Sequence, residues 1–201
     1  MSLYAIVPVQ RLDLAKSRLA QTLSPGDRKA LVLQLLDNVV TALAGSELVS
    51  AIIVVSPDPE ALAQAVAHGA IPLMQEGSGL NPAIRQAREK AHEAGAGELL
   101  IVLADLPFLT TTVVDDLLEA SAGASVTLAP DRHDTGTNAL VLRPLDAIDP
   151  HFGTGSYQAH VAAAAARQQS LHTFHSRATA FDVDTPDDLR ALTDVLSAAP
   201  H

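Results

Sequence analysis

The sequence predicts an α/β fold with a mostly parallel central sheet and helices on both faces. Short apolar runs rich in branched residues alternate along the chain with longer segments of helical spacing. In the clearest run, 99–103, five consecutive apolar residues are typical of a strand buried on both faces of a parallel sheet. The length of 201 residues suits one domain spanning residues 1–201.

The elements are expected in the following order. The first strand spans Leu3 to Val9, and Ser24-Pro25-Gly26-Asp27 begins a helix that ends near Gly45. Further strands are predicted at 51–55, 71–75, 99–103, 125–130, 139–142 and 171–175. Further helices are predicted at about 60–68, 82–94, 112–121 and 157–169, and from Pro186 onward. Asn81 is expected to cap the 82–94 helix, with Pro82 as its first residue.

Composition excludes several classes of function. The chain has no cysteine, so disulfides, thiolate metal sites and cysteine nucleophiles are ruled out. Its formal net charge of −10 argues against broad nucleic-acid binding, which needs a basic face. No apolar run approaches the roughly 18 to 20 residues of a membrane span, and the N-terminus enters a strand without signal-peptide features. We therefore expect a cytoplasmic protein with no membrane partner.

The most basic stretch of the chain follows the first strand and carries Arg11, Lys16 and Arg18. A loop with three cations at the carboxyl end of a strand is suited to binding phosphate groups. A solvated surface loop is the alternative for this stretch.

A single carboxylate, Asp105, follows the 99–103 strand, and Pro107 should end that strand near the Asp. Ligands of open parallel sheets bind just beyond the carboxyl ends of the strands. Asp105 is therefore placed to hold a metal ion, although it could also simply cap the next helix or turn.

Near the C-terminus, Asp182 and Asp184 are two residues apart. On a strand they would project to the same face, where two carboxylates repel each other unless a cation lies between them. Thr185 is expected to cap the last helix. We interpret Asp187 and Asp188 in its first turn as complementing the helix dipole.

Turns that contain glycine complete the set of loops expected at the strand ends: 76–82, 136–138 and 152–156. Together with the carboxylates and cations they indicate a Mg²⁺–nucleotide site. The spacing matches neither a dinucleotide fingerprint nor a P-loop, and no nucleophile elbow or kinase signature is present.

Five motifs in this order resemble the 2-phospho-L-lactate guanylyltransferase family, whose bacterial members are described as phosphoenolpyruvate guanylyltransferases. They are Ile-Val-Pro-Val with Leu-Ala-Lys-Ser-Arg-Leu (6–9 and 14–19), Ala-Asp-Leu-Pro (104–107), Ala-Pro-Asp-Arg with Gly-Thr-Asn-Ala-Leu (129–140), Phe-Gly-Thr-Gly-Ser (152–156) and Asp-Val-Asp-Thr-Pro-Asp-Asp-Leu (182–189). Parts of this pattern are shared with molybdenum-cofactor guanylyl- and cytidylyltransferases. The Gly-Thr-Asn turn followed by Phe-Gly-x-Gly-Ser is more particular to the phospho-acid branch.

The resemblance implies a single Rossmann-like, GT-A-like nucleotidyltransferase domain. Such an enzyme would transfer GMP from GTP to the phosphate of a three-carbon phospho-acid, in the biosynthesis of the deazaflavin coenzyme F-420. It also implies the following roles. Mg²⁺ would be held by Asp105 with Asp182 or Asp184. The leaving pyrophosphate would be stabilised by Lys16 and Arg18. The nucleoside would lie near Gly79, Asn81 and Ser56, and the phospho-acid would be held by Thr137, Asn138, Gly153 and Ser156.

Alternatives remain open on the sequence. One is a sister nucleotidyltransferase that makes a molybdopterin dinucleotide or a sugar nucleotide. Another is a regulatory domain that binds GTP without catalysis. The sequence does not choose among phospholactate, phosphoenolpyruvate and 3-phosphoglycerate, and a homodimer is possible.

Overall fold

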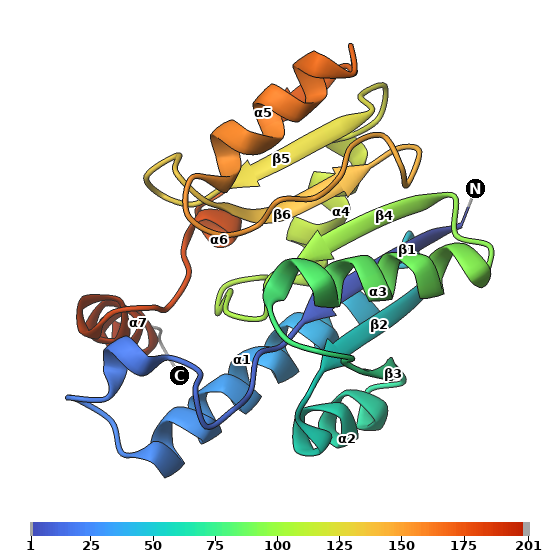
Figure 1. The fold of residues 1–201 in the computed structure, drawn as a ribbon. Helices are drawn as coiled ribbons and strands as arrows, with labels where there is room; N and C mark the ends of the chain where they lie inside the picture. Colours follow the sequence, from blue (N-terminus) through green and yellow to red (C-terminus); the bar gives the residue numbers. More distant parts are fainter. Residues whose placement is uncertain (1, 199–201) are drawn as a thin grey trace.

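Within residues 2–198, which the computed structural model describes, seven strands form one sheet in the order β3-β2-β1-β4-β6-β5-β7 (Figure 1). The strands are β1 (Leu3–Pro8), β2 (Ala51–Ser56), β3 (Ile71–Met74), β4 (Glu98–Val102), β5 (Val126–Pro130), β6 (Thr137–Leu142) and β7 (Leu171–Thr173). β6 is antiparallel to its neighbours β4 and β5, and the other pairings are parallel, which confirms the mostly parallel sheet.

The direction of β6 matters for the site. Because β6 runs against the other strands, its amino end lies at the edge where their carboxyl ends lie. β1 pairs with β2 on one side and with β4 on the other, so the strand order reverses there. Ligands of open α/β sheets bind at such a switch point, outside the carboxyl ends of the strands.

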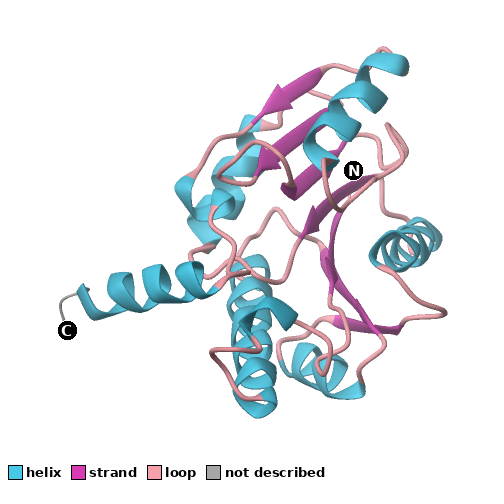
Figure 2. Cartoon of the chain, turned by 60° about the vertical axis from the view of Figure 1, so that its left-hand side comes forward, coloured by secondary structure: helices cyan, strands magenta, loops and turns pink. Residues whose placement is uncertain are grey.

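Helices cover both faces of the sheet, as predicted (Figures 1 and 2). They are α1 (Pro25–Ala44), α2 (Pro59–Ala67), α3 (Leu80–Glu93), α4 (Thr111–Ala120), α5 (Ser156–Ala166), α6 (Arg177–Ala180) and α7 (Pro186–Ala198), with a short 3₁₀ helix, η1 (Ser17–Leu19). One apolar layer packs α1, α2 and α4 against the sheet, and the other packs α3 and α5. Leu100 lies in the first layer and Leu99 in the second, so β4 is buried on both faces.

α7 extends away from the sheet (Figure 2). Its first turns are held by a small apolar cluster in which Val183 and Leu192 pack against Leu35 of α1. None of the described helices is both long and apolar enough to cross a membrane.

Two local predictions were wrong, and one condition considered on the sequence is not met. Asn81 does not cap α3, because the helix begins at Leu80, two residues earlier than predicted, and Gly79 is the N-cap, with a φ of 98° that glycine adopts without strain. Thr137 and Asn138 lie on β6 rather than in the turn before it. Asp182 and Asp184 lie in an extended loop between α6 and α7, not on a strand, so strand alternation does not place their side chains.

Candidate active site

Lys16 is the cation at the centre of the candidate site. Its Nζ donates to Asp105 Oδ2 at 2.7 Å and to Asp184 Oδ1 at 2.8 Å, and only 9% of its side chain is exposed. Burial by itself lowers the pKa of this ammonium, but attraction to Asp105 and Asp184 outweighs burial and raises the pKa. Lys16 also has a left-handed backbone, with φ 53° and ψ 40°, a conformation that non-glycine residues rarely adopt outside constrained sites.

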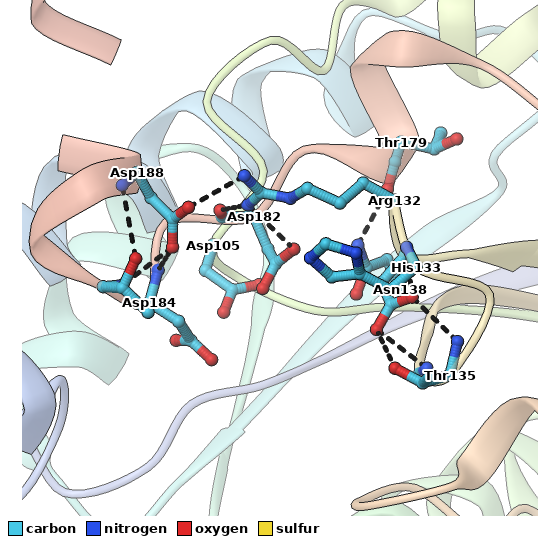
Figure 3. Close-up of polar contacts among 12 residues, drawn as sticks. Asp105, Arg132, His133, Thr135, Asn138, Thr179, Asp182, Asp184 and Asp188 are labelled. Carbon is cyan, nitrogen blue, oxygen red and sulfur yellow. Dashed lines mark hydrogen bonds and ion pairs between the residues drawn. The ribbon is translucent and has the colours of Figure 1, made fainter. Parts of the chain in front are cut away.

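Asp182 lies close to the two carboxylates that accept from Lys16, Asp105 and Asp184 (Figure 3). One carboxylate oxygen from each lies within 4.8 Å of the others. Burial raises the pKa of Asp182, and the neighbouring charges of Asp105 and Asp184 raise it further. The three carboxylates therefore carry more negative charge than Lys16 alone neutralises.

The same cluster fits a divalent cation. Asp105 Oδ1 is buried and has no hydrogen-bond partner among the described residues, a costly condition for a carboxylate oxygen. Three carboxylate oxygens in close proximity are the ligands that a hard cation such as Mg²⁺ prefers. Ligation would satisfy the buried oxygen and relieve the repulsion among the three charges.

A cleft runs from this cluster along the carboxyl ends of β1 and β2. A cavity of about 230 Å³ is lined by Lys16, Asp105 and Asp184. It shares Pro8, Val9, Gln10 and Leu80 with a second cavity of about 400 Å³, which extends to Pro57 and the 77–79 turn. The larger cavity has the size of a small-molecule site. The two cavities together form an elongated space with the acidic cluster at one end.

The residues expected at the nucleoside lie in different surroundings. Gly79 lines the larger cavity. Ser56 is fully buried at the end of β2, where its Oγ accepts from the Asp58 backbone N–H, and its neighbour Pro57 lines the cavity instead. Asn81 turns to the Phe152 backbone, donating to its carbonyl at 2.9 Å and accepting from its N–H at 2.8 Å. It thereby ties the start of α3 to the 152–156 loop.

The residues expected at the phospho-acid form a buried polar network. The Thr137 backbone N–H donates to Ser156 Oγ at 2.8 Å, so these two residues are in direct contact. His160 Nε2 accepts from the His151 backbone N–H, so the neutral ring must carry its proton on Nδ1 and donate it to Thr137 Oγ1, 3.0 Å away. Both hydroxyls accept within the network and keep their own protons available to donate.

The other predicted residues are also placed. Gly153 has a φ of 122°, which glycine tolerates, and precedes the start of α5. Asn138 is buried and donates to the Thr179 carbonyl. Arg18 is exposed on η1, so the structure does not bring it into the Lys16 cluster.

Sequence reasoning missed Arg132 as a site residue. It follows β5 and extends to the acidic loop, where its guanidinium pairs with Asp188 at 2.8 Å and contacts Asp182 (Figure 3). The preceding residue, Asp131, accepts hydrogen bonds from the 133–136 turn, and an added Cβ at Gly136 would lie 2.8 Å from its carboxylate. A cation next to a turn-forming Asp at a strand end was the available signal.

Comparison with solved structures shows which proteins share this fold. The fold matches a nucleotidyl transferase from Methanothermobacter, with a TM-score of 0.70, 14% identity and 98% of each chain covered. It also matches a cytidylyltransferase from Leptospira borgpetersenii, with a TM-score of 0.67, 11% identity and coverage of 100% of this chain and 89% of that one. These matches show that the chain shares its fold with nucleotidyltransferases of known structure.

The sequence comparisons give the family. Residues 3–194 match the family model described as "Guanylyl transferase CofC like". A phosphoenolpyruvate guanylyltransferase from Sphaerobacter thermophilus is 53% identical over 192 residues, which cover 96% of this chain and 93% of the relative. One from Rubrobacter xylanophilus is 45% identical over 193 residues, covering 96% and 94%. The chain belongs to the CofC-like guanylyl transferase family, which confirms the resemblance of its motifs.

Proposed function

We propose that this guanylyltransferase transfers GMP from GTP to the phosphate group of phosphoenolpyruvate, in the biosynthesis of coenzyme F-420. A phosphate oxygen of the acceptor forms a bond to the α-phosphorus of GTP, and the bond from that phosphorus to the oxygen bridging to the β-phosphate breaks. Pyrophosphate leaves, and a new phosphoanhydride joins GMP to the phospho-acid. The relatives named for this acceptor are the basis for choosing phosphoenolpyruvate.

The observation that carries the proposal is the convergence of Lys16 with three carboxylates at the end of the cleft. A phosphomonoester is mostly dianionic near pH 7, since its second pKa is about 6, so the attacking oxygen needs no general base. The main obstacle is therefore the repulsion between two polyanions. Lys16, together with a Mg²⁺ ion bound by the carboxylates, would reduce this repulsion at the point of transfer.

The residues divide this work. Asp105, Asp182 and Asp184 would hold Mg²⁺, which supplies positive charge to the phosphates when bound. Lys16 stabilises the charge that develops on the leaving pyrophosphate, and Arg18 is proposed to join it when a nucleotide fills the cleft. Gly79 lets the backbone approach the nucleoside in the larger cavity.

The acceptor is proposed to bind on the other side of the acidic cluster. There, Thr137 and Ser156 donate their hydroxyl protons and Gly153 its backbone N–H, at the start of α5. Asn138, the neighbour of Thr137, supports this part of the site through its hydrogen bond to the Thr179 carbonyl. The start of a helix favours an anion because its unpaired N–H groups and its dipole both attract negative charge.

The test is pyrophosphate release by the purified protein with Mg²⁺, pairing GTP, CTP or ATP with phosphoenolpyruvate, 2-phospho-L-lactate or 3-phosphoglycerate. Release with GTP and phosphoenolpyruvate alone is the expected result. Release with GTP and another acid would replace the acceptor and leave the reaction intact. Release with CTP, or none with any pair despite GTP binding, would overturn the proposal in favour of a sister transferase or a regulatory domain.

Two further expectations belong with this function. We propose that the protein acts in the cytoplasm, where its proposed substrates are formed. A homodimer stays a prediction, and light scattering on the purified chain would measure its mass in solution.

A further inference from the structure

The segment 181–184 carries two of the three clustered carboxylates without belonging to a helix or a strand. Its orientation must therefore come from contacts other than a regular ladder. The Val183 side chain is fully buried, and its N–H donates to the Asp105 carbonyl at 3.3 Å. This contact sets the distance of the segment from Asp105, but one long hydrogen bond does not fix the rotation of the two flanking carboxylates.

The Arg132 side chain supplies most of the remaining contacts. One terminal nitrogen donates to the Asp182 backbone carbonyl at 2.6 Å and lies 3.5 Å from its carboxylate. The other pairs with Asp188 at 2.8 Å, and the guanidinium carbon lies 4.5 Å from the centre of the Phe181 ring. A single planar side chain thus contacts three residues of the 181–188 region (Figure 3).

Asp188 extends the same arrangement to the second carboxylate. Its Oδ2 accepts from the backbone N–H groups of Asp184 at 3.0 Å and Thr185 at 2.7 Å, while its Oδ1 faces Arg132. Asp188 N–H in turn donates to Thr185 Oγ1, which forms a reciprocal cap at the start of α7. Arg132 therefore contacts Asp182 directly and reaches Asp184 through Asp188.

The backbone of Arg132 connects this arrangement to the proposed acceptor loop. Its N–H donates to the Ala180 carbonyl, and Asn138, at the start of β6, donates to the carbonyl of Thr179. The loop that leads to Thr137 and the loop that carries the acidic cluster are thus joined at several points.

We propose that Arg132 is a positioning residue that, with Asp188, orients Asp182 and Asp184 to bind a divalent cation. The proposal rests on the proposed function, which assigns a cation to this cluster. Arg132 needs no contact with GTP or the acceptor in this role. Its planar, forked guanidinium is required, because an ammonium cannot make the same set of directed contacts.

Charge alone predicts the opposite result when Arg132 is removed. Arg132 is a cation beside carboxylates, so its charge repels a metal ion, and its loss would tighten metal binding. Loss of orientation would instead weaken metal binding. Residues that orient metal ligands typically contribute 10- to 100-fold to affinity, so the two explanations differ in sign as well as in size.

The experiment measures Mn²⁺ binding to the full chain by electron paramagnetic resonance of the free ion, with and without GTP. The variants are Arg132→Gln, Arg132→Lys and Asp188→Asn. The matched control is Arg177→Gln, which removes an exposed arginine from the same surface. We expect Arg132→Gln to weaken Mn²⁺ binding about tenfold or more, with Arg132→Lys giving only partial recovery. Arg177→Gln should bind like the wild type.

The double variant Arg132→Gln/Asp188→Asn should bind Mn²⁺ no more weakly than the weaker-binding single variant, because each change by itself already removes the Arg132–Asp188 contact. Thermal unfolding checks that each variant is folded, and Arg132→Lys provides the test if Arg132→Gln does not fold. Unchanged or tighter Mn²⁺ binding by Arg132→Gln, or a defect that appears only in KM for the acceptor, would overturn the positioning role. Absence of saturable Mn²⁺ binding by the wild type would overturn the proposed metal site together with it.

Discussion

Lys16 Nζ donates to Asp105 Oδ2 at 2.7 Å although the two residues are 89 positions apart. The pairing joins the loop after β1 to the end of β4, across the point where the strand order reverses. In the proposed function, this buried ammonium exchanges its carboxylate partners for phosphate oxygens when the substrates and a metal ion bind. This relationship and its surroundings lead to five predictions.

Replacing Lys16 with Met should reduce kcat for pyrophosphate release by about 100- to 1,000-fold, the range for losing one group that stabilises charge in a transition state. Lys16→Arg should not restore activity, because a forked guanidinium differs in shape from the ammonium that fits between Asp105 and Asp184. Lys29→Met is the matched control, since Lys29 is partly exposed and pairs with Glu60. Near-normal turnover of Lys16→Met would contradict the assignment.

Asp105→Asn should abolish most activity and shift the Mg²⁺ dependence of the remainder to higher concentrations, since one charged ligand of three is lost. Titration of initial rates with Mg²⁺ measures both effects. Asp116→Asn, at an exposed position of α4, should leave the titration unchanged. An unaltered Mg²⁺ requirement in Asp105→Asn would place the metal elsewhere.

Ser156→Ala should raise KM for phosphoenolpyruvate about 10-fold or more while leaving KM for GTP close to the wild-type value. A hydrogen bond to a charged group contributes about 1.5–3 kcal/mol, and the proposed acceptor is dianionic. The variant also leaves the buried Thr137 N–H without its partner, so its free energy of unfolding should fall. Equal changes in both KM values would argue against a specific acceptor contact.

His160 should make stability depend on pH. Burial, with a smaller effect of His151, lowers the pKa of His160 to about 4 from an ordinary 6.5. Because the folded pKa is depressed, the unfolded state binds a proton between these values and the folded state does not. The stability that comes from keeping His160 neutral is complete above about pH 6.5. It is lost as the pH falls towards 4, which lowers the free energy of unfolding by about 3 kcal/mol.

Urea unfolding measured from pH 4 to 8 would test the His160 prediction, with His160→Gln as the comparison. The wild type should lose stability over this range more steeply than the variant. Equal slopes for the two proteins would exclude His160 as the source.

Asn81→Ala should lower the free energy of unfolding by about 1–3 kcal/mol, because the Phe152 backbone N–H and carbonyl both lose their side-chain partner. Asn81→Asp should cost less, since a carboxylate can still accept from the N–H. Denaturant midpoints at constant m-value measure the effect. A destabilisation equal in both variants would show that the accepted bond contributes little.

The sequence predicted much of the fold because the relevant signals are local. Residues 99–102 of the predicted apolar run are buried on both faces of the sheet, as their composition indicated, and the strand ends before the partly buried Leu103. Helix α1 begins after Ser24, whose side chain accepts from Asp27 N–H, as expected for a cap. The family resemblance predicted that Asp182 or Asp184 joins Asp105, and in the structure both carboxylates lie close to it, although neither is on a strand.

The pairing of particular residues could not be predicted in the same way. Asn81 has the residue type of a helix cap, yet it binds Phe152, 71 positions away, because α3 packs beside the 152–156 loop. Lys16 and Arg18 are both cations of the same loop, but only Lys16 pairs with the acidic cluster, while Arg18 is exposed. Arg132 joins the site only because the loop after β5 packs against Asp188, a contact that its local sequence does not indicate.

The sequence by itself therefore determined the order of strands and helices, the burial of the sheet and the residue types at the strand ends. These follow from hydrophobic periodicity and turn chemistry, which act over a few residues. The tertiary structure alone decided that β6 is antiparallel, that Lys16 lies between Asp105 and Asp184, and that Arg132 holds the acidic loop. Those features depend on contacts between segments far apart in the chain, whose energies become defined only when the sheet and its helices have packed together.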